Sequence, residues 1–112
     1  MTPDLNHQVT EAILAAESLP PGCPEAKVAF CRVSEIEEAI ARQKAATSLE
    51  GFVARLGAVT AALSAGEPKR ALELATRYER EVRHVRWGSQ KLRELMEEAA
   101  NLILVENVRR WP

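Results

Sequence analysis

The chain has few aromatic residues and no long apolar run. Aromatic side chains make up 4% of its 112 residues, and no apolar segment approaches the roughly 20 residues of a membrane-spanning helix. The first residues, MTPDLNHQ, contain an acid and no basic cluster. We therefore expect neither a secretory signal nor a transmembrane segment, and no membrane partner.

Cysteine and histidine are also scarce. Cys23 and Cys31 are eight residues apart, and the two histidines are His7 and His84. A disulfide is an option in an oxidising compartment, but nothing points to one, so we expect reduced thiols and a cytoplasmic location. This set matches no usual zinc spacing and places no base beside a nucleophile. We predict no enzyme activity, catalytic residue, metal or cofactor.

What the chain does contain favours helices. Apolar residues make up 46% and charged residues 28%, with a net charge of only −1, which excludes a disordered chain. Alanine and leucine, both strong helix formers, are abundant. The sequence predicts one domain over residues 1–112, folded as an all-α bundle of four to five amphipathic helices.

Capping residues and apolar spacing set the expected boundaries. Thr2 and Pro3 predict the N-cap and first residue of a helix that ends near Ser18, before the PPGCP segment at 20–24. A second helix is expected from Pro24. The alternative is a short strand at residues 27–33, followed by a helix that begins later, at a capping box. We favour the continuous helix because a lone strand would have no other strand to pair with.

Three more segments follow. Thr47, Ser48 and Glu50 predict the start of a third helix, which ends at Gly66. Glu67 and Pro68 predict the start of a fourth. Gly88 and Ser89 then predict a break or kink before the last helix, although one long helix through Gly88 stays an alternative. The expected core positions of this last segment are Leu92, Leu95, Met96, Ala99, Leu102 and Ile103.

Basic residues gather on the fourth helix. Residues 68–93 carry eight Lys and Arg residues against three Glu residues, in a chain that is slightly acidic overall. This basic face could be an ordinary solvated surface, or it could bind an acidic protein or nucleic acid; we favour protein because the pI is about 6.1. The candidate residues are Arg70, Arg77, Arg80, Arg83 and Trp87.

A second candidate surface consists of apolar residues that lie off the core stripes. Such residues near a chain end either fold back over their own core or form an interface with a second copy or a partner. Small residues on the back of the third helix could let another helix approach. The candidate interface residues are Leu104, Val105, Val108, Trp111, Ala54 and Ala58.

The Pro-rich first turn, the basic fourth helix and the tail NLILVENVRRWP together resemble the QslA-type anti-activators of bacterial quorum sensing. The resemblance implies a cytoplasmic, non-enzymatic homodimer that binds the ligand-binding domain of a LuxR-type transcription factor. Binding would block dimerisation of that activator and hence its attachment to DNA. It assigns no individual residue a role.

From these observations we expect a regulatory protein that sequesters a protein partner, which the resemblance implies is a quorum-sensing activator. The alternative is a nucleic-acid-binding protein that uses the basic fourth helix.

Overall fold

The computed structural model describes residues 4–111 and consists of five α-helices joined by short turns. They are α1 (Leu5–Glu17), α2 (Pro24–Gln43), α3 (Leu49–Ser64), α4 (Pro68–Glu81) and α5 (Arg86–Arg109). The prediction of an all-α bundle is confirmed. Residues 27–33 lie within α2, so the helical interpretation is confirmed and the strand is not formed. None of the helices in this part of the chain is long and apolar enough to span a membrane.

Local capping explains where the helices begin. The predicted cap at Thr2 and Pro3 lies outside the described residues, and the Asp4 carboxylate accepts hydrogen bonds from two backbone N–H groups at the start of α1. Pro24 and Pro68 stand in the first turns of α2 and α4, where a missing N–H costs nothing. The Ser48 hydroxyl accepts from the Gly51 N–H and caps α3.

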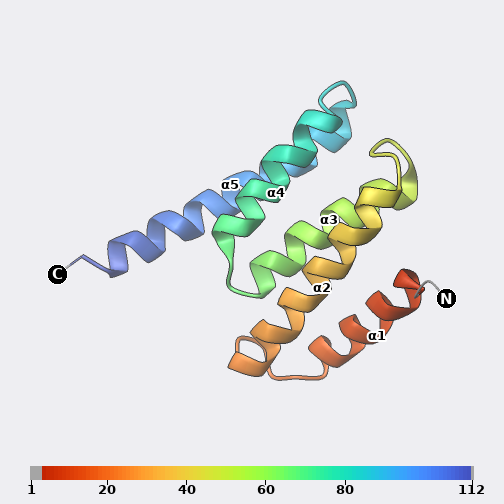
Figure 1. Ribbon diagram of the computed structural model, residues 1–112. Helices are drawn as coiled ribbons and strands as arrows, with labels where there is room; N and C mark the ends of the chain where they lie inside the picture. The colour runs from red at the N-terminus through yellow and green to blue at the C-terminus, as the bar shows by residue number, and fades with distance from the viewer. Residues whose placement is uncertain (1–3, 112) are drawn as a thin grey trace.

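The helices are stacked in chain order (Figure 1). α1 packs on α2 only, whereas α3 contacts α2, α4 and α5 and is the central element. The radius of gyration is 14.5 Å, above the roughly 13 Å expected for a compact domain of this length. The chain is therefore more extended than a closed bundle.

The core is built mainly from small side chains. α3 buries Ala54, Ala58 and Ala61 inside the single chain. α2 covers this face, and the Ser34 hydroxyl on α2 donates a 2.7 Å hydrogen bond to the Ala58 carbonyl. The expectation that Ala54 and Ala58 form an interface with another molecule is wrong, because α2 already occupies the surface that their small size leaves open.

The predicted break at Gly88 is also wrong. α4 ends at Glu81, and α5 begins at Arg86 and passes through Gly88 without interruption. Gly88 is buried, and a Cβ there would lie 3.2 Å from the Phe52 ring. The glycine therefore permits close packing of α5 on α3, and the turn between the helices lies a few residues earlier.

Candidate protein-interaction surfaces

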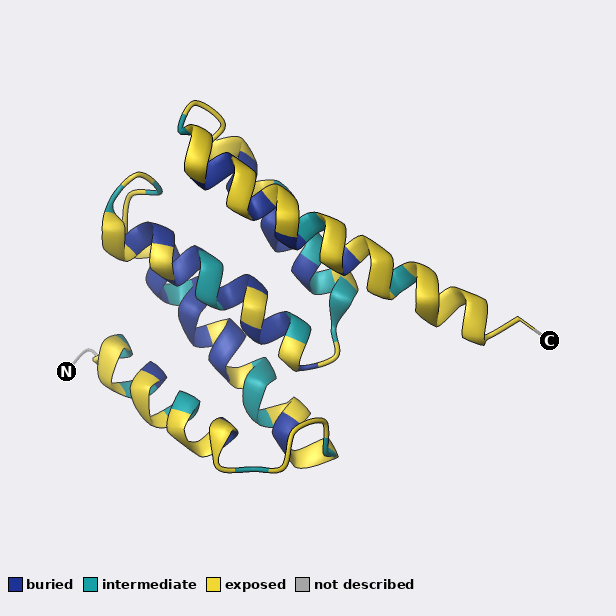
Figure 2. Cartoon of the chain, turned by 180° about the vertical axis from the view of Figure 1, so that it is seen from behind, coloured by how far each residue is buried: buried dark blue, intermediate teal, exposed yellow. Residues whose placement is uncertain are grey.

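α5 projects beyond the rest of the molecule (Figure 1). It has 24 residues, whereas α4, against which it packs, has 14. At 1.5 Å per residue the excess is about 15 Å of helix. Figure 2 shows that the surface of this projecting end is almost entirely exposed.

Burial along α5 stops at Ala99. Leu92, Leu95 and Ala99 are buried as predicted. Leu102 and Ile103 were expected in the core, but Leu102 is exposed and Ile103 only half-buried. Their positions have the helical spacing of the core stripe, but none of the helices within residues 4–111 extends far enough to cover them.

The projecting end carries an apolar stripe made of Leu104, Val105, Val108 and Trp111. These side chains are 61%, 47%, 64% and 83% exposed. Positions 104, 105 and 108 lie in the last turns of α5, within about 100° of one another around the helix axis, and Trp111 follows just after the helix ends at Arg109. These four predicted interface residues therefore lie exposed at the same end of the chain, whereas Ala54 and Ala58 lie elsewhere in the core.

Charged residues flank the α5 stripe. Glu106 and Arg110 form an exposed ion pair with an Nη2 to Oε1 distance of 3.4 Å, and Arg109 is also exposed. Exposed pairs of this kind add little to stability. Their side chains remain free to form the polar rim that surrounds the apolar centre of a typical interface.

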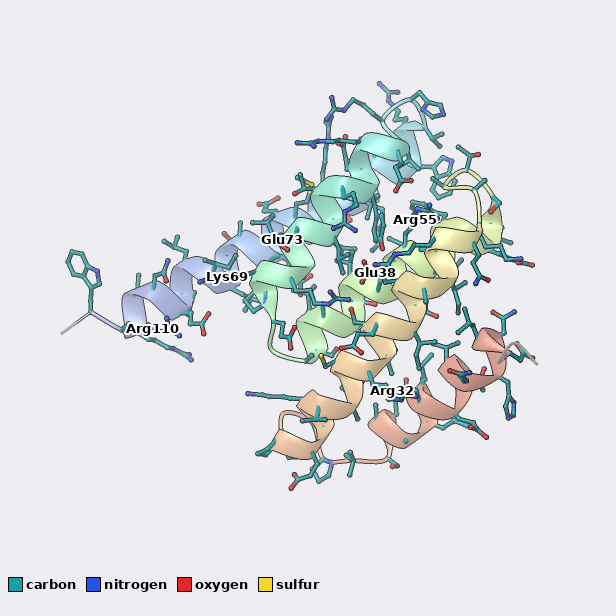
Figure 3. The ribbon with its side chains drawn as sticks, viewed as in Figure 1. Arg32, Glu38, Arg55, Lys69, Glu73 and Arg110 are labelled. Carbon is teal, nitrogen blue, oxygen red and sulfur yellow. The ribbon has the colours of Figure 1, made fainter. Side chains whose placement is uncertain are left out.

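The predicted basic face is divided by the fold into two parts. Arg70 and Arg77 reach across to Glu38 on α2, at 2.9 and 3.4 Å, and Arg42 joins them at 2.8 Å. Figure 3 shows Glu38 between α2 and α4. The three arginines hold the pKa of this largely buried carboxyl below its usual value, against the opposing effect of burial. Arg70 and Arg77 thus help to join two helices.

The second part lies at the turn between α4 and α5. Arg83 and Arg93 both pair with the buried Glu79 carboxylate, which also accepts a hydrogen bond from Ser89. These hydrogen bonds hold the pKa of Glu79 below its usual value. Arg80 is exposed and has no ion-pair partner among the described residues. Trp87 is 62% exposed while its ring meets Phe52 edge-on.

This turn also contains a surface cavity of about 410 Å³. Its lining comprises Arg83, His84, Arg86, Ser89, Gln90 and Arg93. The lining holds several basic side chains and no carboxylate, so its chemistry suits an anion. The one hydroxyl of this lining, that of Ser89, donates its hydrogen bond to Glu79 and not to His84.

Sequence reasoning missed Arg55, a buried arginine on α3. Its guanidinium pairs with both carboxylate oxygens of Glu81 at 3.2 Å and donates to the carbonyls of Lys44 and Gly51. It thereby ties the α2–α3 turn to the end of α4. Its position within the apolar spacing of α3 was the only signal that it points inward.

The two cysteines are both free. Burial, assisted by Glu67 and Glu35, raises the pKa of the Cys31 thiol to about 11. A thiol with such a pKa is protonated at neutral pH and is a poor nucleophile or metal ligand. Within residues 4–111 no cluster of His, Cys, Asp and Glu could hold a metal ion.

Comparison of the chain with protein-family models, with curated proteins and with solved structures finds no match.

Proposed function

We propose that this protein is a non-enzymatic regulator that forms a homodimer and sequesters a protein partner. The observation that carries the proposal is the α5 stripe, whose four apolar side chains project beyond the fold with no helix in the described part of the chain to cover them. Contiguous exposed apolar residues with a polar rim are typical of protein interaction sites.

The class of partner follows from the QslA-type resemblance, which suggests the ligand-binding domain of a LuxR-type transcription factor. A rigid helix with an apolar face can occupy a surface that such an activator uses for its own dimerisation. The competition requires affinity alone and no chemistry. An activator held as a monomer would lose its paired contacts with DNA.

Energetics limit how the α5 stripe can act. Burial of each aliphatic side chain contributes about 1.5 to 3 kcal/mol, whereas association costs about 4 to 15 kcal/mol. Ala54 and Ala58 contribute nothing to an interface because they are buried in the core. Stable association must therefore include Trp111, the neighbouring Leu102 and the charged rim.

The turn between α4 and α5 suits the recognition of an acidic partner. After Arg83 and Arg93 have paired with Glu79, each guanidinium is still largely exposed, and Arg80 and Arg86 are exposed beside them. Surface charges of one sign increase the rate of encounter with an oppositely charged protein and fix its orientation.

Light scattering after size-exclusion chromatography tests the homodimer. We expect a mass twice the 12.4 kDa of one chain, and we expect Leu104→Asp and Val108→Asp to shift the protein to monomer. Leu14→Asp is the matched control, because Leu14 on α1 is as exposed as Val108. A native protein that is monomeric at tens of micromolar would contradict the dimer.

The partner is tested by mixing the protein with a purified LuxR-type receptor bound to its DNA site. We expect the native protein to release the DNA and the Leu104→Asp variant to do so much less, with Leu14→Asp equal to native. Retention of the receptor on DNA at excess native protein would contradict this partner.

A second candidate function, nucleic-acid binding, is favoured by the basic cavity at the α4–α5 turn. It predicts retardation of DNA or RNA at low salt, with a steep loss of affinity as salt rises. Charge reversal at Arg80 and Arg83 should abolish the retardation. If the native protein causes no retardation at low salt, this function is excluded.

A further inference from the structure

A groove between α1, α2 and α3 contains a buried carboxyl group. It has a volume of about 320 Å³ and is lined by Ile13, Glu17, Phe30, Val33, Glu37, Gly57, Thr60, Ala61 and Ser64. The Glu37 residue is only 9% exposed. Among the residues that the structure describes, none forms an ion pair or a hydrogen bond with its carboxylate. Its oxygens are not enclosed by the protein, so the carboxylate faces the open groove without a protein partner and is accessible to a ligand.

The charges of the lining have one sign. Glu37 comes from α2 and Glu17 from α1, while α3 contributes Gly57, Thr60, Ala61 and Ser64, and the lining contains no Lys, Arg or His. Ile13, Phe30, Val33 and Ala61 form an apolar part of the wall, and Thr60 and Ser64 add two hydroxyl groups. A groove with two carboxylates and a hydrocarbon wall is complementary to a cationic head on an apolar body.

Gly57 creates the space for the carboxyl group. It lies in the middle of α3, where glycine weakens a helix by about 1 kcal/mol relative to alanine. A Cβ at this position would overlap the Glu37 carboxylate. The glycine therefore allows Glu37 to lie flat against α3, at the base of the groove.

The environment of Glu37 has a measurable consequence. Burial raises the pKa of its carboxyl from the ordinary value of 4.5 to about 7. The group is thus partly protonated at neutral pH, and a bound cation would favour its ionised form. Binding and ionisation are linked, so a cationic ligand must lower this pKa and a neutral ligand must not.

We propose that this groove binds a small organic ammonium ion, with the ammonium group on Glu37 and the hydrocarbon portion against Ile13, Phe30 and Val33. The volume is at the lower end of the range for ligand pockets, which fits an arylalkyl ammonium of about ten non-hydrogen atoms. The site is separate from the α5 stripe, because α1 packs only on α2. The proposal therefore stands or fails independently of dimerisation.

Phenethylammonium is the probe, with 2-phenylethanol as its neutral counterpart and 3-phenylpropionate as its anionic one. The carboxyl resonance of Glu37 in the full-length protein is followed by NMR while pH is varied. Saturating phenethylammonium should lower the Glu37 pKa by about one unit, equivalent to about tenfold tighter binding to the ionised form. The alcohol should shift it by much less and the carboxylate should not bind.

Binding should also strengthen about fivefold between pH 6 and pH 8, as a tenfold preference for the ionised form and a pKa of about 7 require. Glu37 becomes ionised over this interval, while the alkylammonium, with a pKa near that of lysine at about 10, keeps its charge. Glu17 is the only other titratable group in the lining. The Glu17→Gln variant should weaken binding at both pH values yet keep the pH dependence, which assigns that dependence to Glu37.

Glu37→Gln preserves side-chain volume and should weaken phenethylammonium binding about tenfold or more at pH 8, since it removes a charge-assisted hydrogen bond. Glu35→Gln is the matched control, because Glu35 is an exposed glutamate of the same helix outside the groove; it should bind like native. Equal affinity for the ammonium and the alcohol, or an unmoved Glu37 resonance with saturating ammonium, would overturn the proposal.

Discussion

Glu37 and Glu38 are adjacent residues of α2, and each is 9% exposed. Successive residues of a helix point about 100° apart, so Glu37 faces the groove beside α1 and α3 whereas Glu38 faces α4. Glu38 meets Arg42, Arg70 and Arg77 and has a lowered pKa. Glu37 meets no cation among the residues that the structure describes, and burial raises its pKa. At equal burial the two carboxyl groups therefore have pKa shifts of opposite sign, because only Glu38 has cationic partners.

The comparison predicts that loss of the Glu38 charge has the largest effect. Glu38→Gln leaves three arginines close together without their shared carboxylate. We expect it to lower the free energy of unfolding by about 2 kcal/mol, less than for a fully buried pair because Arg42 and Arg77 are more than half exposed. Urea denaturation at pH 7 measures the change. Glu35→Gln should unfold like native, and equal loss in both variants would contradict the assignment.

Glu37→Gln should raise the free energy of unfolding, whereas Glu38→Gln should lower it. A raised pKa means that the native state binds a proton which the unfolded state has released, so stability falls as pH rises from about 4.5 to about 7. We expect Glu37→Gln to be more stable than native by about 1 to 2 kcal/mol at pH 8, the full effect of the shift being reduced by solvent in the groove. The advantage should vanish below pH 4.5.

Thermal unfolding at pH 4 and pH 8 checks this second prediction. If the difference in stability between the native protein and Glu37→Gln is the same at both pH values, burial does not perturb the pKa of the Glu37 carboxyl.

The ion pairs of Glu38 should make stability depend on pH in the opposite direction, with a smaller loss of stability as pH falls. Its pKa is lowered, so its contribution is fully present above the ordinary carboxyl value of 4.5 and is lost as pH falls through the lower value of the folded state. The difference in stability between native protein and Glu38→Gln should therefore be constant above pH 5 and narrow below it. Urea midpoints measured from pH 3 to pH 7 test this, and a difference at pH 3 as large as that at pH 7 would contradict it.

Local signals in the sequence predicted most of the fold. Pro24, Ser48, Pro68 and Gly66 each act through their own backbone or a neighbour a few residues away, and the helices begin and end near them. Gly88 was misinterpreted because the reason for a glycine there is the Phe52 ring, 36 positions earlier in the chain. Capping residues and helix-breaking residues act locally, so they give no information on long-range packing of this kind.

The candidate surfaces could be predicted only in part. The spacing of Leu104, Val105 and Val108 placed them off the core stripe, and they are exposed. The spacing also predicted that Ala54 and Ala58 lie on the face of α3 opposite its core stripe, but it could not show that α2 packs against that face. Glu37 and Glu38 were both missed as sites, because adjacent glutamates in a helix are ordinarily solvated. Gly57, a glycine in mid-helix, was the available signal of a close approach.

The smallest predicted effect concerns the contact between Gly57 and Glu37, and it requires a double-mutant cycle. Gly57→Ala should gain helix propensity but force the Glu37 carboxylate out of the groove, because the new methyl group would overlap it. In a Glu37→Ala background that conflict is absent, so Gly57→Ala should stabilise the protein by close to the full propensity difference of about 1 kcal/mol. We expect a coupling free energy of about 1 kcal/mol between the two sites from urea denaturation at pH 8. Ala substitution at exposed Glu35 in place of Glu37 is the control and should show no coupling with Gly57→Ala. Additive effects of Gly57→Ala and Glu37→Ala would show that the carboxylate does not rest on α3, and would remove the geometric basis for the groove.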